Sequence, residues 1–201
     1  MRNPMHRNVL VVICVITVVI AVSAGVLIYR SKSKQTAQDT GLKGELTEKE
    51  VQTASNPIIW ADFPDPDVIR VGDEFYMVTT TMHMMPGVPV MRSTDLVNWE
   101  IVSYVYDRLE ENDAHNLRNG MNIYGNGAWA PCIRYYDGTF FVLFASLDTG
   151  KTYLFSAKDP AGPWQRTEFN QYLHDPSLLF DDGRAYIIYG RTDIMIKELT
   201  S

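Results

Sequence analysis

Residues 64–78 read PDPDVIRVGDEFYMV, and two later stretches of the chain repeat this pattern. Residues 129–143 read WAPCIRYYDGTFFVL, and residues 174–188 read HDPSLLFDDGRAYII. Each copy combines a small or acidic residue, a proline, a short apolar strand, a turn that contains glycine, and an aromatic-rich strand. A hairpin that recurs at roughly 45–65 residues predicts a repeat architecture, and for all-β units of this size the repeat is a propeller blade.

Further strands complete the first two units. Residues 88–93 and 153–157 are predicted third strands, because their apolar and aromatic residues suit a pleated surface. Each is followed by a turn that ends in tryptophan, Trp99 or Trp164, and then by a polar–apolar strand pattern. Four strands per unit match one blade. No amphipathic helix of ten or more residues is predicted here, so the fold class is all-β, with about three blades in residues 56–201.

The N-terminal part has a different composition. Residues 9–29 carry no charge and are long enough to span a bilayer as one helix. The alternative is a cleaved signal peptide, although the apolar run continues past the small residues at 22–24. Residues 1–30 are therefore expected to form a transmembrane signal-anchor or a signal peptide, and residues 31–55 a polar linker. Basic residues flank both ends of the apolar run, so the charge pattern specifies its orientation poorly.

Composition and cysteine usage exclude several classes of protein. The net charge is −6, and no basic cluster with interleaved aromatic residues occurs, so no nucleic-acid partner is expected. Cys14 lies in the apolar run and Cys132 on a predicted strand, so no disulfide framework and no cysteine-based metal site are predicted. Residues 107–124 form a long polar insertion, which is either functional or a solvated loop.

Two aspartates hold equivalent places in the repeats. Asp65 and Asp175 precede the proline of the first and third copies, where the second copy has Ala130. The innermost strands of a propeller line a central channel, so both carboxylates are expected to face one cavity, as glycoside hydrolysis requires. The alternative is that Asp-Pro is turn chemistry only, which Ala130 argues against. Asp62 and Asp67 are expected to point away from the cavity because of strand alternation.

Four motifs together resemble glycoside hydrolase family 43. They are NPIIWADFPDPDVIR at residues 56–70, DLVNW at 95–99, GAWAP at 127–131, and HDPS followed by FDDG at 174–183. The resemblance implies a five-bladed β-propeller of which this chain contains about three blades. It also implies an inverting hydrolase that cleaves xylosyl or arabinofuranosyl linkages of plant polysaccharides, as in xylan degradation.

The resemblance also implies roles for single residues. Asp65 corresponds to the general base of the family, and Asp175 to the aspartate that tunes the pKa of the general acid and orients it. Met82, His83 and Trp129 correspond to places that contact the sugar. Each of these three has a structural alternative: a core methionine, a structural histidine, and a tryptophan packed between blades.

The general acid of the family is a glutamate some tens of residues beyond the third-blade aspartate. Glu198 lies in what looks like a closing strand and is expected to be a surface residue. The chain is therefore expected to be a fragment that carries two of three catalytic carboxylates and is inactive alone. No cofactor is required. Some members of the family hold calcium in the channel, but no pattern in this chain demands it.

The implied substrate, a xylose- or arabinose-containing oligo- or polysaccharide, lies outside the cell. The domain is therefore expected to be extracytoplasmic, either secreted or held at the membrane through residues 9–29. The alternative function is a membrane-anchored, non-catalytic propeller module that binds a glycan or a protein.

Overall fold

The computed structural model describes residues 54–82 and 84–200, which belong to a compact unit of residues 53–201. The predicted signal or anchor segment, His83 and the linker apart from its last two residues lie outside the described residues, so these expectations stay predictions. Among the described residues, no helix is long and apolar enough to cross a bilayer. The secondary structure assigned within them consists of strands, as the all-β prediction requires.

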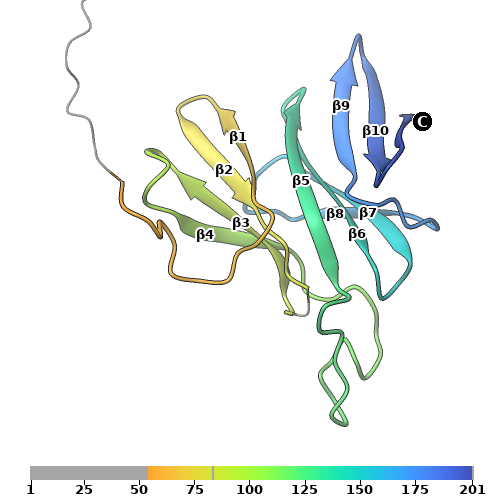
Figure 1. The fold of residues 1–201 in the computed structure, drawn as a ribbon. Coiled ribbons are helices and arrows are strands. Elements are labelled where there is room, and N and C mark those ends of the chain that lie inside the picture. Colours follow the sequence, from red (N-terminus) through yellow and green to blue (C-terminus); the bar gives the residue numbers. More distant parts are fainter. Residues whose placement is uncertain (1–53, 83, 201) are drawn as a thin grey trace, which may run out of the picture. The chain divides into compact units, whose positions relative to one another are not determined.

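In the described part of the chain, eleven strands form three antiparallel sheets (Figure 1). Sheet A runs in the order β1 (Asp67–Val71), β2 (Glu74–Val78), β3 (Gly87–Ser93) and β4 (Glu100–Tyr106). Sheet B runs in the order β5 (Ala128–Tyr136), β6 (Thr139–Ser146), β7 (Lys151–Ala157) and β8 (Gln165–Phe169). Sheet C runs in the order β9 (Ser177–Asp181), β10 (Arg184–Gly190) and β11 (Ile194–Leu199). Each sheet is thus a meander that begins with one copy of the repeat.

Two-residue turns close the hairpin of each repeat. Asp137 and Gly138 both have positive φ, at 46° and 69°, and Asp182 and Gly183 repeat this with 45° and 75°. Two successive residues with positive φ define the type I′ turn, whose twist matches that of the flanking strands. In the first repeat only the glycine of the Gly72-Asp73 pair has positive φ, at 62°. Each hairpin register is thus set by a two-residue turn that contains glycine.

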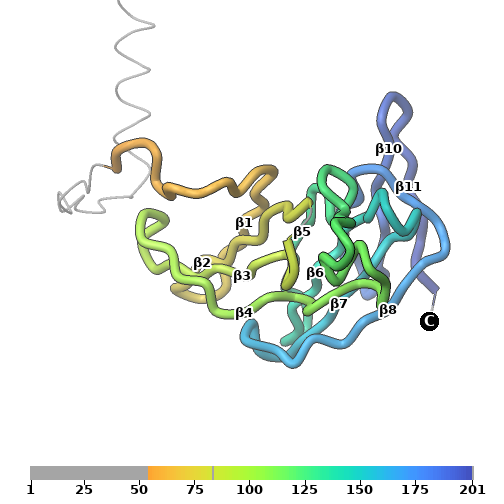
Figure 2. The backbone as a smooth tube through the Cα atoms, turned by 90° about the horizontal axis from the view of Figure 1, so that it is seen from below, coloured from red at the N-terminus to blue at the C-terminus, as the bar shows by residue number. Residues whose placement is uncertain are grey.

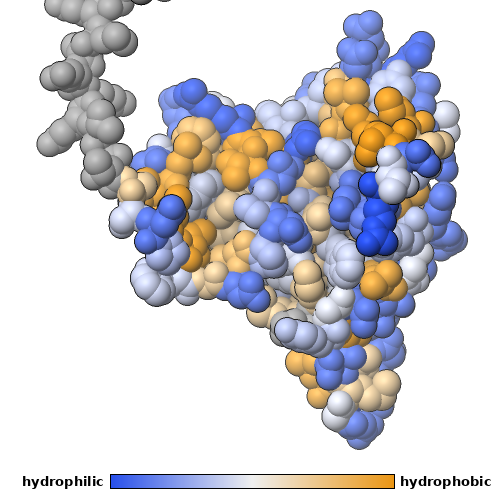
Figure 3. All heavy atoms as spheres, in the orientation of Figure 1, coloured by the Kyte–Doolittle hydropathy of each residue, from blue (hydrophilic) through white to orange (hydrophobic). Residues whose placement is uncertain are grey.

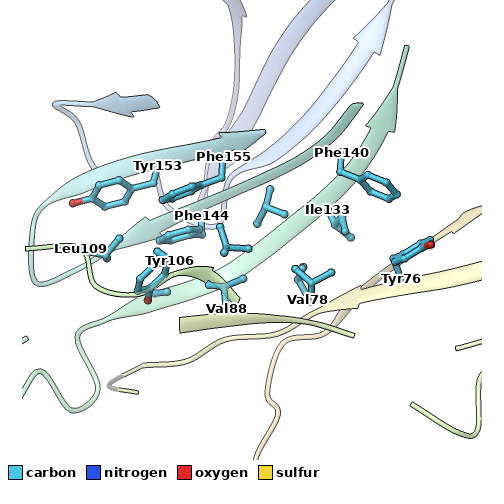
Figure 4. Close-up of a cluster of buried hydrophobic side chains, with 14 residues drawn as sticks. Tyr76, Val78, Val88, Tyr106, Leu109, Ile133, Phe140, Phe144, Tyr153 and Phe155 are labelled. Atoms are coloured by element: carbon cyan, nitrogen blue, oxygen red, sulfur yellow. The ribbon is translucent and has the colours of Figure 1, made fainter. Parts of the chain in front are cut away.

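The sheets pack side by side through their first strands (Figure 2). β1 contacts β5, and β5 contacts β9, so the starts of the three repeats are neighbours in space. A core between sheets A and B is built from fully buried side chains such as Val78, Val88, Ile133 and Phe144 (Figure 4). Burial of apolar surface of this kind supplies roughly 25 cal/mol per Å² of stabilisation.

A second core lies between sheets B and C and includes Leu143, Leu178 and Ile187. The outer strand of sheet C, β11, is mostly exposed. Its residues Ile194 and Ile196 are 67% and 66% exposed. Figure 3 shows apolar side chains at the surface over the upper part of sheet C.

The polar insertion before β5 is anchored to the core rather than only solvated. Leu109, His115 and Ile123 of this segment are buried. The Nε2 atom of His115 lies 2.7 Å from Oδ2 of Asp148, which belongs to the turn between β6 and β7. This contact between a buried histidine and an exposed aspartate ties the insertion to sheet B.

Candidate active site

The starts of the three repeats line one hollow of about 280 Å³. It is formed by residues of the β1 approach, of β5 and of the β9 approach: Asp65, Pro66, Asp67, Ala130, Pro131, Cys132, Arg134, Asp175, Pro176 and Ser177. The structure therefore brings Asp65 and Asp175 together, although 110 residues separate them in sequence. Both residues are exposed to solvent at this hollow.

The residue before each of these prolines has the same unusual backbone. Asp65, Ala130 and Asp175 have φ of 50°, 35° and 44°. Positive φ is sterically costly for a residue with a Cβ, by about 1–3 kcal/mol where the surroundings impose it. Ala130 adopts it without a polar side chain, so the backbone shape belongs to the fold, and the carboxylates at the other two positions are a separate feature.

One hydrogen bond from a buried threonine holds the carboxylate of Asp65. The hydroxyl of Thr80, just beyond the end of β2, donates to Oδ2 of Asp65 at 3.0 Å. The same hydroxyl oxygen accepts the backbone N–H of Ala130 at 2.8 Å. Asp65 is thereby connected to sheet A and to the start of sheet B.

Asp175 has a different environment. Oδ2 of Asp175 lies 3.4 Å from Nε2 of His174, and the Tyr172 hydroxyl lies 3.2 Å from Nδ1 of the same histidine. Burial raises the pKa of Tyr172, the negative charge of Asp175 raises it further, and the positive charge of Arg191 opposes both effects. The charge of Asp175 therefore influences the pKa of Tyr172.

Arg134 connects all three sheets at the hollow. Its Nη1 donates to Oδ2 of Asp67 in β1 at 2.6 Å, and its Nη2 donates to the hydroxyl of Ser177 in β9 at 2.8 Å. Its Nε donates to the backbone oxygen of Leu178 at 3.1 Å. Asp67 Oδ2 also accepts the backbone N–H of Ile133 at 2.9 Å. The guanidinium, whose fixed fork of donors suits such bridging, holds the two outer sheets against the central one.

The expectation that Asp67 points away from the cavity is wrong, since Asp67 lines the hollow with Asp65. Strand alternation could not have placed it relative to Asp65, because β1 begins at Asp67 and Asp65 has a positive φ. Arg134 and Thr80 were not predicted, because no local pattern tells which distant group a buried side chain will meet. Asp62 is not among the residues that line the hollow.

Of the predicted sugar-contacting residues that the structure describes, neither Met82 nor Trp129 is part of the wall of the hollow. The backbone oxygen of Met82 accepts the N–H of Gly127 at 2.6 Å, and a Cβ at Gly127 would lie 2.2 Å from that oxygen. Only glycine permits this approach of the two chain segments. Trp129 is half-buried, donates its indole N–H to the oxygen of Gly125 at 3.0 Å, and has its ring 6.5 Å from that of His174.

Glu198 lies in β11, where its Oε1 is 3.8 Å from Nε of Arg184 and its side chain is 45% exposed. No glutamate appears among the described residues that line the hollow. Within residues 54–82 and 84–200, no group of three or more His, Cys, Asp or Glu side chains could hold a metal ion. The charged side chains that line the hollow are those of Asp65, Asp67, Arg134 and Asp175.

Residues 54–200 match the model of the family described as Glycosyl hydrolases family 43. The chain belongs to this family, and the resemblance seen in its motifs is confirmed. The family's members act on glycosidic bonds, which agrees with two carboxylates that line one hollow.

Curated relatives include a non-reducing end α-L-arabinofuranosidase of Bacteroides ovatus, which is 40% identical over 142 residues. That match covers 68% of this chain and 26% of the relative. A β-xylosidase of Formosa agariphila is 37% identical over 142 residues, which cover 68% of this chain and 24% of the relative. The chain thus spans about a quarter of the length of these relatives.

Two solved structures have the same arrangement of strands. A bifunctional GH43-CE protein of Bacteroides eggerthii has a TM-score of 0.69 and 48% identity, over 73% of this chain and 19% of its own. A xyloglucan-locus GH43B protein of Bacteroides ovatus has a TM-score of 0.62 and 32% identity, over 73% of this chain and 30% of its own.

Proposed function

We propose that the hollow is part of the active site of an inverting glycoside hydrolase that acts on xylosyl or arabinofuranosyl linkages of plant polysaccharides. The observation that carries the proposal is the meeting of Asp65 and Asp175 from two different sheets at one hollow. The names of the arabinofuranosidase and xylosidase relatives support the choice of sugars.

In this proposal Asp65 is the general base. It removes a proton from a water molecule as that water attacks the anomeric carbon from the face opposite the leaving group. Its position at the rim leaves it accessible to a sugar and to water. The hollow of about 280 Å³ also has room for the attacking water, whose share of liquid volume is about 30 Å³.

Asp175 is the proposed tuning carboxylate. A negative charge close to a glutamic acid makes ionisation of that acid less favourable and keeps it protonated near neutral pH. A protonated acid can then donate its proton to the leaving-group oxygen. Asp175 is exposed at the hollow, where it can meet such a group.

Sheets A, B and C correspond in this proposal to three blades of a five-bladed propeller, with β1, β5 and β9 as the innermost strands. The contacts of β5 with β1 on one side and with β9 on the other support this assignment. Because no described glutamate lines the hollow, we further propose that residues 1–201 alone do not cleave natural linkages.

The test compares two kinds of substrate on the 201-residue chain. Xylo- and arabino-oligosaccharides need a general acid and should not be cleaved. Dinitrophenyl xylosides and arabinofuranosides release a leaving group that needs no proton, and any turnover should fall about 10²–10⁴-fold in Asp65→Asn, the usual contribution of a general base. Asp95→Asn is the matched control, because Asp95 lies in a turn of sheet A outside the hollow.

Cleavage of an oligosaccharide by this chain would contradict the proposal that residues 1–201 lack a general acid. Dinitrophenol release that is unchanged in Asp65→Asn would contradict the assignment of Asp65 as the general base. Binding of oligosaccharides to the hollow without any turnover would favour a non-catalytic glycan-binding module.

A further inference from the structure

Three consecutive threonines follow β2, and all three are buried, with Thr79, Thr80 and Thr81 at 0%, 1% and 2% exposure. Their hydroxyls have different partners. Thr81 accepts the backbone N–H of Val88 at 2.8 Å, whereas the Thr79 hydroxyl has no hydrogen-bond partner in the described structure. Only the middle hydroxyl, that of Thr80, contacts a proposed catalytic group.

We propose that Thr80 is a positioning residue for Asp65, and this inference rests on the proposed role of Asp65 as the base. A threonine hydroxyl has one proton to donate and lone pairs to accept with. The N–H of Ala130 occupies the accepting side at 2.8 Å. The hydroxyl proton is therefore directed at Oδ2 of Asp65, since an ionised carboxylate can only accept.

This arrangement sets the orientation of the base. With Oδ2 held by Thr80, Oδ1 of Asp65 has no hydrogen-bond partner among the described residues and remains for a water molecule. The backbone N–H of Thr80 also donates to the oxygen of Pro64 at 3.0 Å, directly before Asp65. Thr80 thus holds both the backbone and the side chain of this segment, which fixes a group that would otherwise move freely at an exposed rim.

The contact also coordinates two repeats. Asp65 belongs to the first copy and Ala130 to the second, and one hydroxyl joins them. A shift of the second repeat relative to the first would break one of the two hydrogen bonds. The base is therefore positioned relative to the neighbouring sheet as well as to its own.

The test measures the side-chain rotamer of Asp65 by NMR, through the three-bond couplings of its carboxyl carbon. The wild-type chain should show a single χ1 rotamer. Thr80→Val removes the hydroxyl at almost constant shape and should give averaged couplings, whereas Thr80→Ser should retain the single rotamer. Thr79→Val, which deletes the neighbouring unpartnered hydroxyl, is the matched control and should leave Asp65 unchanged.

Hydrogen exchange at Ala130 provides a second readout. Loss of its acceptor in Thr80→Val should accelerate exchange of the Ala130 amide by about five- to thirtyfold, which corresponds to one lost hydrogen bond. Thr80→Ser and Thr79→Val should retain wild-type protection. A single Asp65 rotamer in Thr80→Val, or averaging that Thr80→Ser fails to restore, would overturn the proposal.

If Thr80→Val does not fold, the wild-type chain still gives the answer. The hydroxyl proton of Thr80 should exchange slowly with water in wild type and rapidly in Asp65→Ala, a residue type that Ala130 shows to be tolerated in this backbone conformation. Rapid exchange in wild type would refute the hydrogen bond. These measurements do not depend on hydrolysis, so a failure of the proposed function and a failure of this inference give different results.

Discussion

Aspartates in turns of this molecule have two different environments. Asp95 represents the first, and the pair Asp65 and Asp175 represents the second. Oδ1 of Asp95 accepts the backbone N–H groups of Val97 and Asn98, each at 2.8 Å, and its Oδ2 accepts the Asn98 side-chain amide at 2.7 Å. These bonds, first those from Asn98 and then that from Val97, hold the pKa of Asp95 well below its usual range.

The aspartates at the hollow lack such local partners. Within the described part of the chain, neither Asp65 nor Asp175 accepts a backbone N–H; the first meets the Thr80 hydroxyl and the second lies near His174. An aspartate that serves a turn satisfies its own backbone. The comparison teaches that the two aspartates before proline do not perform this structural task, which leaves them available for chemistry.

The largest expected effect concerns the network that forms the hollow. Arg134→Met removes the hydrogen bonds to Asp67, Ser177 and Leu178 and leaves the Asp67 charge half-buried. We expect a loss of about 2–4 kcal/mol in the free energy of unfolding, measured by urea denaturation. Arg184→Met is the matched control, since Arg184 is exposed on β10, and should leave the midpoint unchanged. Equal midpoints for the two variants would show that the network does not hold the sheets together.

The second effect separates the energetic cost of the positive-φ backbone at the hollow from the contribution of the carboxylates. Ala130 has the same positive φ as Asp65 and Asp175. A β-branched residue is poorly tolerated there, so Ala130→Val should cost about 1–3 kcal/mol of unfolding free energy. Ala130→Gly should stay within about 1 kcal/mol of wild type, because glycine adopts positive φ freely but loses more chain entropy. Thermal unfolding of the two variants measures this difference. Equal unfolding free energies for Ala130→Val and Ala130→Gly would contradict the strain argument.

A smaller effect tests the comparison of the aspartates directly. Asp175→Ala removes no hydrogen bond to another described residue and introduces a residue type seen at Ala130, so the unfolding free energy should change by no more than about 0.5 kcal/mol. Asp95→Ala leaves two backbone N–H groups without their acceptor and should lower the urea midpoint. The reverse order of the two midpoints would mean that Asp175 serves the turn after all.

The smallest expected effect is a pH dependence. A depressed pKa in the folded state means that the charge of Asp95 contributes stability above the unfolded pKa of about 3.9, and that this contribution is lost as the pH falls through the folded value. Asp95→Asn cannot titrate and should lose less stability than wild type between about pH 5 and pH 2. Urea midpoints of both proteins should be measured across that pH range. Parallel dependence of the two midpoints on pH would contradict the contribution of Asp95 ionisation to stability.

Much of the local structure could be predicted from the sequence. The three repeats, the hairpin turns with glycine, the third strands at Val88 and Tyr153, and the equivalence of Asp65 with Asp175 were all readable. Each depends on neighbours within a few residues: strand alternation, turn residues and repeat spacing. The strand that follows Trp99 was found for the same reason.

The rest of the site could not be predicted because its partners are distant in sequence. Thr80 meets Ala130 across 50 residues, and Arg134 meets Asp67 across 67. His115 was part of an insertion that looked polar, yet its ring is buried against Asp148. Which of several chemically similar side chains finds a given partner depends on how the sheets dock.

By itself the sequence determined the three repeated hairpins, the family and the two aspartates before proline, since each of these is written in short-range patterns. The repeats also predicted that Asp65 and Asp175 face one cavity, and both line one hollow. Only the tertiary structure decided that Thr80 holds the first of them and that Arg134 joins the three sheets. The physical reason is that hydrogen bonds between buried groups are specified by the packing of whole sheets, which no local run of residues encodes.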